Sequence, residues 1–209
     1  ALSDLAGVTD IAGTDPHDFT LDPDLGDRRD HASYGLVGKL SLGDLEMADD
    51  MRTLYVVNLF DRSIYALDVS SGSAADTTLI DSWSTPNECG TSEHRPMGLA
   101  WSADKLWVGS VCQDISGAHV HSLNPTTGDF MLEVTVPLDY AREQVLNVPN
   151  LSEDVLANWN AWTDDPTVFE YSFINETNGE FEITYPQPML SDIEFDGPHM
   201  ILGIRDRFG

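Results

Sequence analysis

Residues 97–109 read Met97-Gly-Leu-Ala-Trp-Ser-Ala-Asp104, then Lys105, then Leu106-Trp-Val-Gly109. This is an apolar strand that begins beside a glycine, a polar turn and a second apolar strand. The same template occurs twice more, at residues 43–50 with 54–57 and at residues 191–197 with 200–203. Short apolar runs bounded by Gly, Asp, Asn, Ser and Pro are typical of β-strands. We therefore expect an all-β protein built from an internal repeat.

The second copy of the template continues into two more strand-like runs, residues 119–123 and 130–136. Four consecutive antiparallel strands form one blade of a β-propeller. Gly43 and Gly98 lie 55 residues apart, about one blade with generous loops. Gly98 and Asp192 lie 94 apart, which fits a blade with a long insertion or two irregular blades. A β-sandwich also uses short strands, but it does not explain the repeated strand–turn–strand template.

The predicted fold is therefore a β-propeller of four-stranded antiparallel blades, present here in part. Residues 36–209 hold three to four blades, with a long insertion near 140–180, and residues 1–35 form an irregular N-terminal segment. Closed propellers use roughly four to eight blades. An incomplete ring leaves a strand edge that must pair elsewhere. We therefore expect other protein chains, or the rest of a longer polypeptide, as partners.

The charge of the chain excludes two classes of partner. Asp and Glu number 36 against 10 Lys and Arg, which gives a net charge of −26. Binding of nucleic acid or of anionic lipid needs clustered cations, and this chain has few. No apolar run approaches the length of a membrane span, so we expect no membrane insertion. Salt or divalent cations should stabilise so acidic a fold, and solubility in a saline setting is the simpler explanation of the charge.

The two cysteines, Cys89 and Cys112, flank one predicted hairpin. Neither belongs to a Cys/His cluster, so a zinc site is not expected. A disulfide between them would fit a secreted protein, whereas two buried thiols remain the alternative.

Acidic residues recur at equivalent positions of the repeat. Asp44 and Glu46 match Asp192 and Glu194, and residues i and i+2 of a strand point to the same face. On innermost strands these carboxylates would face the central channel, where, together with Asp206, they could bind Ca²⁺. The alternative is that they accept backbone N–H groups or pair with Arg95, Arg205 and Arg207.

Tryptophans on the insertion are the candidate partner-binding residues. Trp159 and Trp162 could stack against a protein partner or the sugar rings of a surface glycan, and the simpler alternative is that they pack over a blade edge. Catalytic candidates are weaker. His94, His119, His121 and His199 lack a partner fixed by sequence, and no nucleophile elbow, phosphate loop or zinc-protease motif is present.

At these repeats the sequence resembles bacterial secreted proteins that carry SdrD-type (serine-aspartate-repeat) surface domains. The resemblance spans roughly residues 36–209 and is most specific at Tyr185-Pro-Gln-Pro-Met-Leu-Ser-Asp-Ile-Glu-Phe195 with residues 201–207; it also includes residues 43–59 and 95–112. It implies an N-terminal propeller of a larger surface protein, without catalytic activity. We therefore expect a non-enzymatic, calcium-stabilised module for adhesion or assembly, extracellular or at the bacterial cell surface. The alternative function is a metal-dependent propeller hydrolase of the lactonase type.

Overall fold

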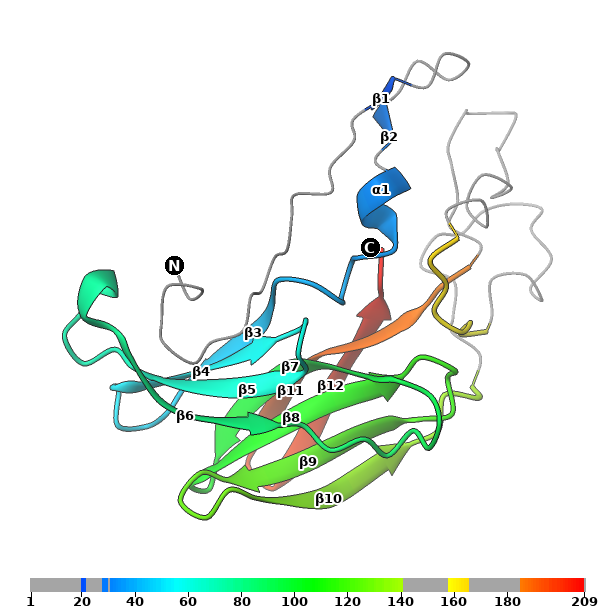
Figure 1. Cartoon of the computed structure of the whole chain (residues 1–209). Coiled ribbons are helices and arrows are strands. Elements are labelled where there is room, and N and C mark those ends of the chain that lie inside the picture. The colour runs from blue at the N-terminus through cyan, green and yellow to red at the C-terminus, as the bar shows by residue number, and fades with distance from the viewer. Residues whose placement is uncertain (1–19, 22–27, 30, 141–157, 166–184, 209) are drawn as a thin grey trace.

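Figure 1 shows the computed structural model of the chain, which describes residues 20–21, 28–29, 31–140, 158–165 and 185–208. Its N-terminal part contains a two-stranded pair, β1 (Thr20–Leu21) and β2 (Arg28–Arg29), and one helical turn, α1 (His31–Tyr34). The β-sheets that follow make up most of the described fold. The sequence pattern also predicts a strand at residues 181–184 and a short helical turn at residues 152–157, and both lie outside the described residues.

The first blade is a four-stranded antiparallel sheet in the order β3-β4-β5-β6. Its strands are β3 (Leu42–Met47), β4 (Thr53–Asn58), β5 (Ser63–Asp68) and β6 (Thr78–Ser84), with a 3-10 turn at Ala74–Asp76 before the last strand. Burial is greatest in the two middle strands of this sheet, β4 and β5, and least in the outermost strand, β6. Strand β5 is buried at almost every position, whereas β6 is mostly exposed.

The second blade repeats this arrangement in the order β7-β8-β9-β10. Its strands are β7 (His94–Ser102), β8 (Lys105–Cys112), β9 (Ala118–Asn124) and β10 (Asp129–Val136). The β7–β8 turn places both Ala103 and Asp104 at positive φ, 54° and 57°. Two positive φ values at the centre of a tight hairpin match the right-handed twist of the flanking strands.

The third unit is a hairpin of β11 (Pro188–Asp196) and β12 (His199–Asp206). Apart from the β1–β2 pair, the described strands therefore form two four-stranded antiparallel sheets and one hairpin, as the prediction of partial propeller blades requires. In these residues no third strand pairs with β12. Strands β3, β7 and β11 are the innermost strands of the first blade, the second blade and the hairpin.

All three innermost strands share one irregularity. The register against the second strand shifts between Leu42 and Leu45, between Pro96 and Leu99, and between Leu190 and Asp192. A β-bulge bends the strand and redirects the side chains that follow it. Because the bulge precedes the same template position each time, the sequence repeat is also a repeat of backbone geometry.

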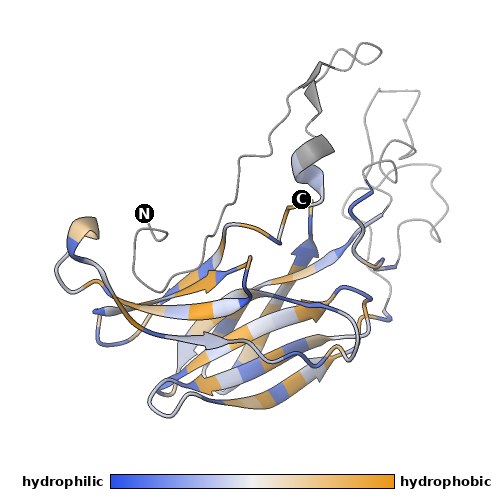
Figure 2. Ribbon diagram, viewed as in Figure 1, coloured by the Kyte–Doolittle hydropathy of each residue, from blue (hydrophilic) through white to orange (hydrophobic). Residues whose placement is uncertain are grey.

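Apolar side chains fill the spaces between neighbouring blades. Figure 2 shows hydrophobic positions alternating with hydrophilic ones along the strands. One buried cluster joins the first and second blades through residues such as Val57, Ile64 and Leu106. A second cluster joins the second blade to the hairpin and includes Val120 and Leu190. Gly109 marks the closest approach there, because a Cβ at this position would lie 2.5 Å from Leu190 Cδ2.

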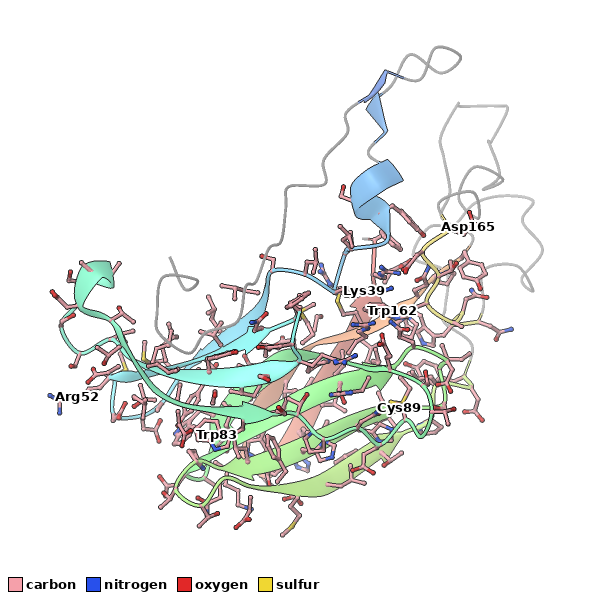
Figure 3. The ribbon with its side chains drawn as sticks, viewed as in Figure 1. Lys39, Arg52, Trp83, Cys89, Trp162 and Asp165 are labelled. Carbon is pink, nitrogen blue, oxygen red and sulfur yellow. A yellow bond between two sulfur atoms is a disulfide. The ribbon has the colours of Figure 1, made fainter. Side chains whose placement is uncertain are left out.

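A buried arginine holds three distant segments together. Arg207, 2% exposed, donates hydrogen bonds of 2.8–3.0 Å to four oxygens, those of Val37 O, Thr163 O, Gln187 Oε1 and Gly35 O. Its guanidinium also lies 4.4 Å from the Trp162 ring centroid and 3.6 Å from the Asp164 carboxylate. Lys39 pairs with the same Asp164 at 2.6 Å. This cluster lies near the labelled Lys39, Trp162 and Asp165 in Figure 3.

Candidate functional site

Two carboxylates connect the first blade to the second. Asp44 Oδ2 accepts the Leu99 N–H at 2.9 Å, and Glu46 Oε1 accepts the Trp101 N–H at 3.1 Å. Asp44 Oδ1 also accepts the N–H of its own neighbour Leu45 at 2.8 Å. Leu99 and Trp101 lie on β7, the innermost strand of the second blade. These acids therefore act as acceptors for backbone N–H groups, which was the alternative to metal binding.

The local fold explains why these side chains reach β7. Asp44 lies within the bulge of β3 and Glu46 two residues beyond it, and Glu46 is opposite Tyr55 on the face that packs against the second blade. Both are half-buried there. Burial raises the pKa of Glu46, the Trp101 N–H opposes that change, and the nearby carboxylates of Asp44, Glu194 and Asp192 raise the pKa further. The four acids predicted to converge are therefore close enough to interact electrostatically.

The equivalent acids on β11 have a different environment. Asp192 and Glu194 are exposed, and their carboxylates form no hydrogen bond or ion pair with the described part of the chain. They lie opposite Gly203 and Ile201 of β12, respectively, and Ile201 is 56% exposed. The hairpin thus has one face packed on the second blade and one face, hereafter its open face, that no described residue outside the hairpin covers.

Asp206 lies apart from these four acids. It is opposite Pro188, at the other end of β12 from the turn, and is 1% exposed. Its Oδ1 accepts the N–H groups of Gln187 at 3.2 Å and of Phe208 at 3.3 Å. The carboxylate therefore terminates the hairpin by capping backbone donors.

Among the described residues, no three of the five predicted metal ligands place their oxygens within 4.8 Å of one another. The one group that meets this spacing is Cys89, Cys112 and His119, whose two sulfurs are bonded to each other and so are not thiolate ligands. Calcium binding remains a prediction. It is based on the net charge and on the proximity of the four repeat acids, Asp44, Glu46, Asp192 and Glu194.

The predicted disulfide between Cys89 and Cys112 is present, with a Cα–Cα distance of 5.4 Å. Cys89 belongs to the connection from β6 to β7, and Cys112 ends β8. The disulfide therefore links the segment that connects the two blades to β8, a middle strand of the second blade. Beside it, Glu88 of the same connection lies 3.3 Å from His121 on β9.

The histidines considered for catalysis lie mainly inside the second blade. His94 contacts Thr85 Oγ1 at 2.7 Å, and burial, reinforced by Arg62 and Arg95, lowers its pKa to about 4. His119 contacts Thr135 Oγ1 at 3.2 Å, and burial lowers its pKa as well. His199 is exposed at the start of β12. In the described part of the chain, none of these histidines lies close enough to the four repeat acids to share a metal ion with them.

Trp159 and Trp162 are buried rather than displayed. They are 5% and 9% exposed and pack in the cluster between the second blade and the hairpin. Trp162 Nε1 donates to Pro188 O at 2.7 Å, and the Trp162 N–H donates to Gln113 O at 2.8 Å. The two rings therefore pack within the fold, which was the alternative to stacking against a partner, and this part of the insertion fills a gap between blades.

Sequence reasoning missed Arg207 as an organiser of this region. The residue was considered only as a partner for acidic side chains, but its main contacts are backbone carbonyls and the Trp162 ring. Those partners come from segments far apart in the sequence, so no local pattern marks them. The neighbouring Arg205 is exposed.

Comparison with known proteins relates the chain to two proteins of Dictyostelium discoideum. It is 26% identical to Colossin-A over 217 aligned residues and 26% identical to Colossin-D over 205. These alignments cover 99% and 96% of this chain but 2% and 18% of the relatives, so the chain spans a small part of each. Both relatives are eukaryotic proteins, whereas the resemblance noted in the sequence was to bacterial ones.

No protein-family model matches the chain, so that comparison gives no support to the SdrD-type resemblance. A solved structure of a Lactobacillus plantarum protein aligns with 49% of this chain and 30% of its own, at 15% identity and a TM-score of 0.35. The fold assignment above rests on the strand pairing within this chain. No helix in its described part is long and apolar enough to cross a membrane.

Proposed function

We propose that this chain is a non-enzymatic structural module of an extracellular or cell-surface protein, stabilised by Ca²⁺, that acts in adhesion or assembly. The observation that carries this proposal is the open face of the β11–β12 hairpin, with Asp192 and Glu194 exposed beside Ile201. An exposed sheet face with one unpaired edge is suited to contact with another protein surface.

The disulfide and the surface charge agree with an extracellular setting. Disulfides persist in oxidising compartments and are rare in the cytosol. A net charge of −26 keeps a protein soluble and makes it responsive to cations. The much greater length of the two colossins is consistent with a module that works within a larger polypeptide.

The lactonase-type alternative has less support. Such an enzyme needs a metal held by several oxygens and a general base beside the bound carbonyl. In the described residues the four repeat acids do not place three oxygens close enough together to hold a metal ion. The side chains of His94, His119 and His121 contact Thr85, Thr135 and Glu88, so they are not free to act as a general base.

A bead assay tests the proposed function. Beads coated with the oxidised chain are expected to cluster, or to attach to cells, when Ca²⁺ is present and to lose that behaviour in EDTA. Beads coated with an equally acidic folded protein are the control, because they reproduce the charge without the blades. A panel of lactones and esters is run in parallel. Metal-dependent turnover that is lost in Glu194→Gln, without bead attachment, would overturn the proposal in favour of the hydrolase.

A further inference from the structure

We propose that the open face of the β11–β12 hairpin is a blade–blade interface, and that its occupant is the innermost strand of a further blade in the same polypeptide. Asp192 and Glu194 would accept two backbone N–H groups of that strand. This inference deepens the proposed function and rests on it, since it names the partner of a structural module.

The same interface already exists once within the chain. Asp44 and Glu46 hold the same template positions on β3 as Asp192 and Glu194 hold on β11, with the first acid at a β-bulge and the second two residues later. On β3 both carboxylates accept N–H groups from the innermost strand of the next blade, at 2.9 and 3.1 Å. On β11 the equivalent carboxylates have no partner in the described residues. The repeat therefore supplies acceptors where the donors are missing.

The direction of each side chain supports the equivalence. On β7 the position matching Asp44 and Asp192 is Gly98, and a Cβ there would lie 2.8 Å from the backbone N of Asp192. This template position therefore points from each blade toward the innermost strand of the following one. Asp192 occupies it in the hairpin, so its carboxylate points toward the place of a next blade.

The apolar packing follows the same order. On β8, Gly109 faces the next unit, because its Cβ position is occupied by Leu190 of β11. Gly203 of β12 lies opposite Asp192 on the open face, as Gly109 does beside Gly98 in the second blade. Ile201, on the same face, is 56% exposed. On β8 the equivalent surface, formed by Gly109 and Trp107, is covered by Leu190 and Phe195 of the next unit. We therefore expect a neighbouring blade to cover Gly203 and Ile201 in the same way.

These contacts specify the chemistry of the occupant. The occupant is an extended strand with two free N–H groups at alternate positions, as Leu99 and Trp101 provide on β7. The residue between the two donors is apolar, as Ala100 is on β7. Carboxylates form stronger hydrogen bonds with N–H groups than neutral acceptors do. Without such donors, burying Asp192 and Glu194 would leave two charges uncompensated.

A second copy of the chain fits this face less well. Two copies joined through the same face would bring four carboxylates together, and each copy already carries a net charge of −26. In a head-to-tail contact, the occupant would be the face of the first blade that points away from the second blade. Val56 and Tyr65 on that face are only 1% and 4% exposed, so little of their surface is available to a second copy. The relatives of the chain are also many times longer than it is.

The test extends the whole chain with a known blade. A second copy of residues 86–139, which includes the second blade and its disulfide, is joined after Gly209 through a Gly/Ser linker and labelled separately with ¹⁵N. Hydrogen exchange is then measured at the amides that copy Leu99 and Trp101. We expect protection of both amides, with exchange about tenfold faster when Asp192→Asn and Glu194→Gln are introduced, as the loss of charged acceptors predicts.

Two controls accompany this measurement. The pair Asp49→Asn and Asp76→Asn makes the same change in net charge at exposed positions of the first blade, away from the open face of the hairpin, and should leave the exchange unchanged. In the original chain, Asp44→Asn with Glu46→Gln should speed exchange at Leu99 and Trp101, which calibrates the effect at the existing interface.

Three results would overturn the inference. The appended blade could remain unprotected, its protection could be independent of Asp192 and Glu194, or the original chain could sediment as a dimer that the double variant dissociates. The last result would make a second copy the occupant. Failure of the bead assay together with a docked, acid-dependent blade would reject the adhesion role but keep this interface, so the two proposals fail separately.

Discussion

Removal of the Cys89–Cys112 disulfide should destabilise the chain by an amount that its loop length sets. The bond spans 23 residues in sequence. Closing a loop of that length removes chain entropy from the unfolded state worth about 3.5 kcal/mol at room temperature. The measurement is urea unfolding of wild type and of Cys89→Ala/Cys112→Ala. At a urea slope of about 2 kcal/mol/M, the midpoint should fall by about 1.7 M.

The reduced wild type separates the covalent bond from packing. It keeps both sulfur atoms, and Cys112 is fully buried, so the alanine variant loses a further contribution of up to about 1 kcal/mol from the lost contacts. Reductant should shift the wild type and leave the variant unchanged. Midpoints for the oxidised and reduced wild type that agree within about 0.2 M at equal slopes would refute the reasoning. The covalent link would then contribute no measurable stability.

The other predictions concern protonation, a buried charge and cations. Because burial lowers the folded-state pKa of His94 to about 4, the stability that its neutral ring contributes should be present above pH ~6.5 and be lost as the pH falls toward 4. Over that window the free energy of unfolding of wild type, measured in urea, should fall by about 2 kcal/mol more than that of His94→Gln, after solvent screening. Equal slopes would contradict this assignment. Arg207→Met should cost at least about 3 kcal/mol in urea unfolding, since carbonyls and Asp164 lose a buried partner; the control Arg205→Met, at an exposed site, should cost less than about 0.5 kcal/mol. If both cost the same, the buried hub is not an organiser. Millimolar Ca²⁺ should raise the melting temperature above that in EDTA, and above that in NaCl of equal ionic strength; a Ca²⁺ effect no larger than that of the NaCl would reject specific binding.

Strand periodicity and the repeat predicted the blades because both are local properties of the sequence. Each template copy encodes two strands and a turn, and those elements occur where the alternation places them. The equivalence of Asp44 and Asp192 also followed from the repeat. Their different environments did not, because the contact of Asp44 with Leu99 joins residues 55 positions apart. Which donors lie opposite an acid depends on the neighbouring blade, and the described residues provide such donors for the acids of β3 but not for those of β11.

The insertion shows the limit of composition as a guide. Trp159 and Trp162 lie in an Asn-rich, irregular segment, which is typical of an exposed loop. In the fold, their rings complete the core between the second blade and the hairpin, and Arg207 packs against Trp162. A large apolar ring is buried wherever the fold leaves a gap, and that gap is made by elements distant in sequence.

The innermost strands reveal two ways of joining blades in this chain. Each such strand has one edge that pairs with no other strand in the described fold, so its N–H groups need acceptors from elsewhere. Between the first and second blades, Asp44 and Glu46 bridge the gap and supply them. Between the second blade and the hairpin, Gly98 occupies that position and the backbones come too close for any side chain. An acid and a glycine are thus alternative solutions, one for a wide junction and one for a tight junction. Because Asp192 and Glu194 are acids, the sequence of β11 specifies a wide junction on its open side.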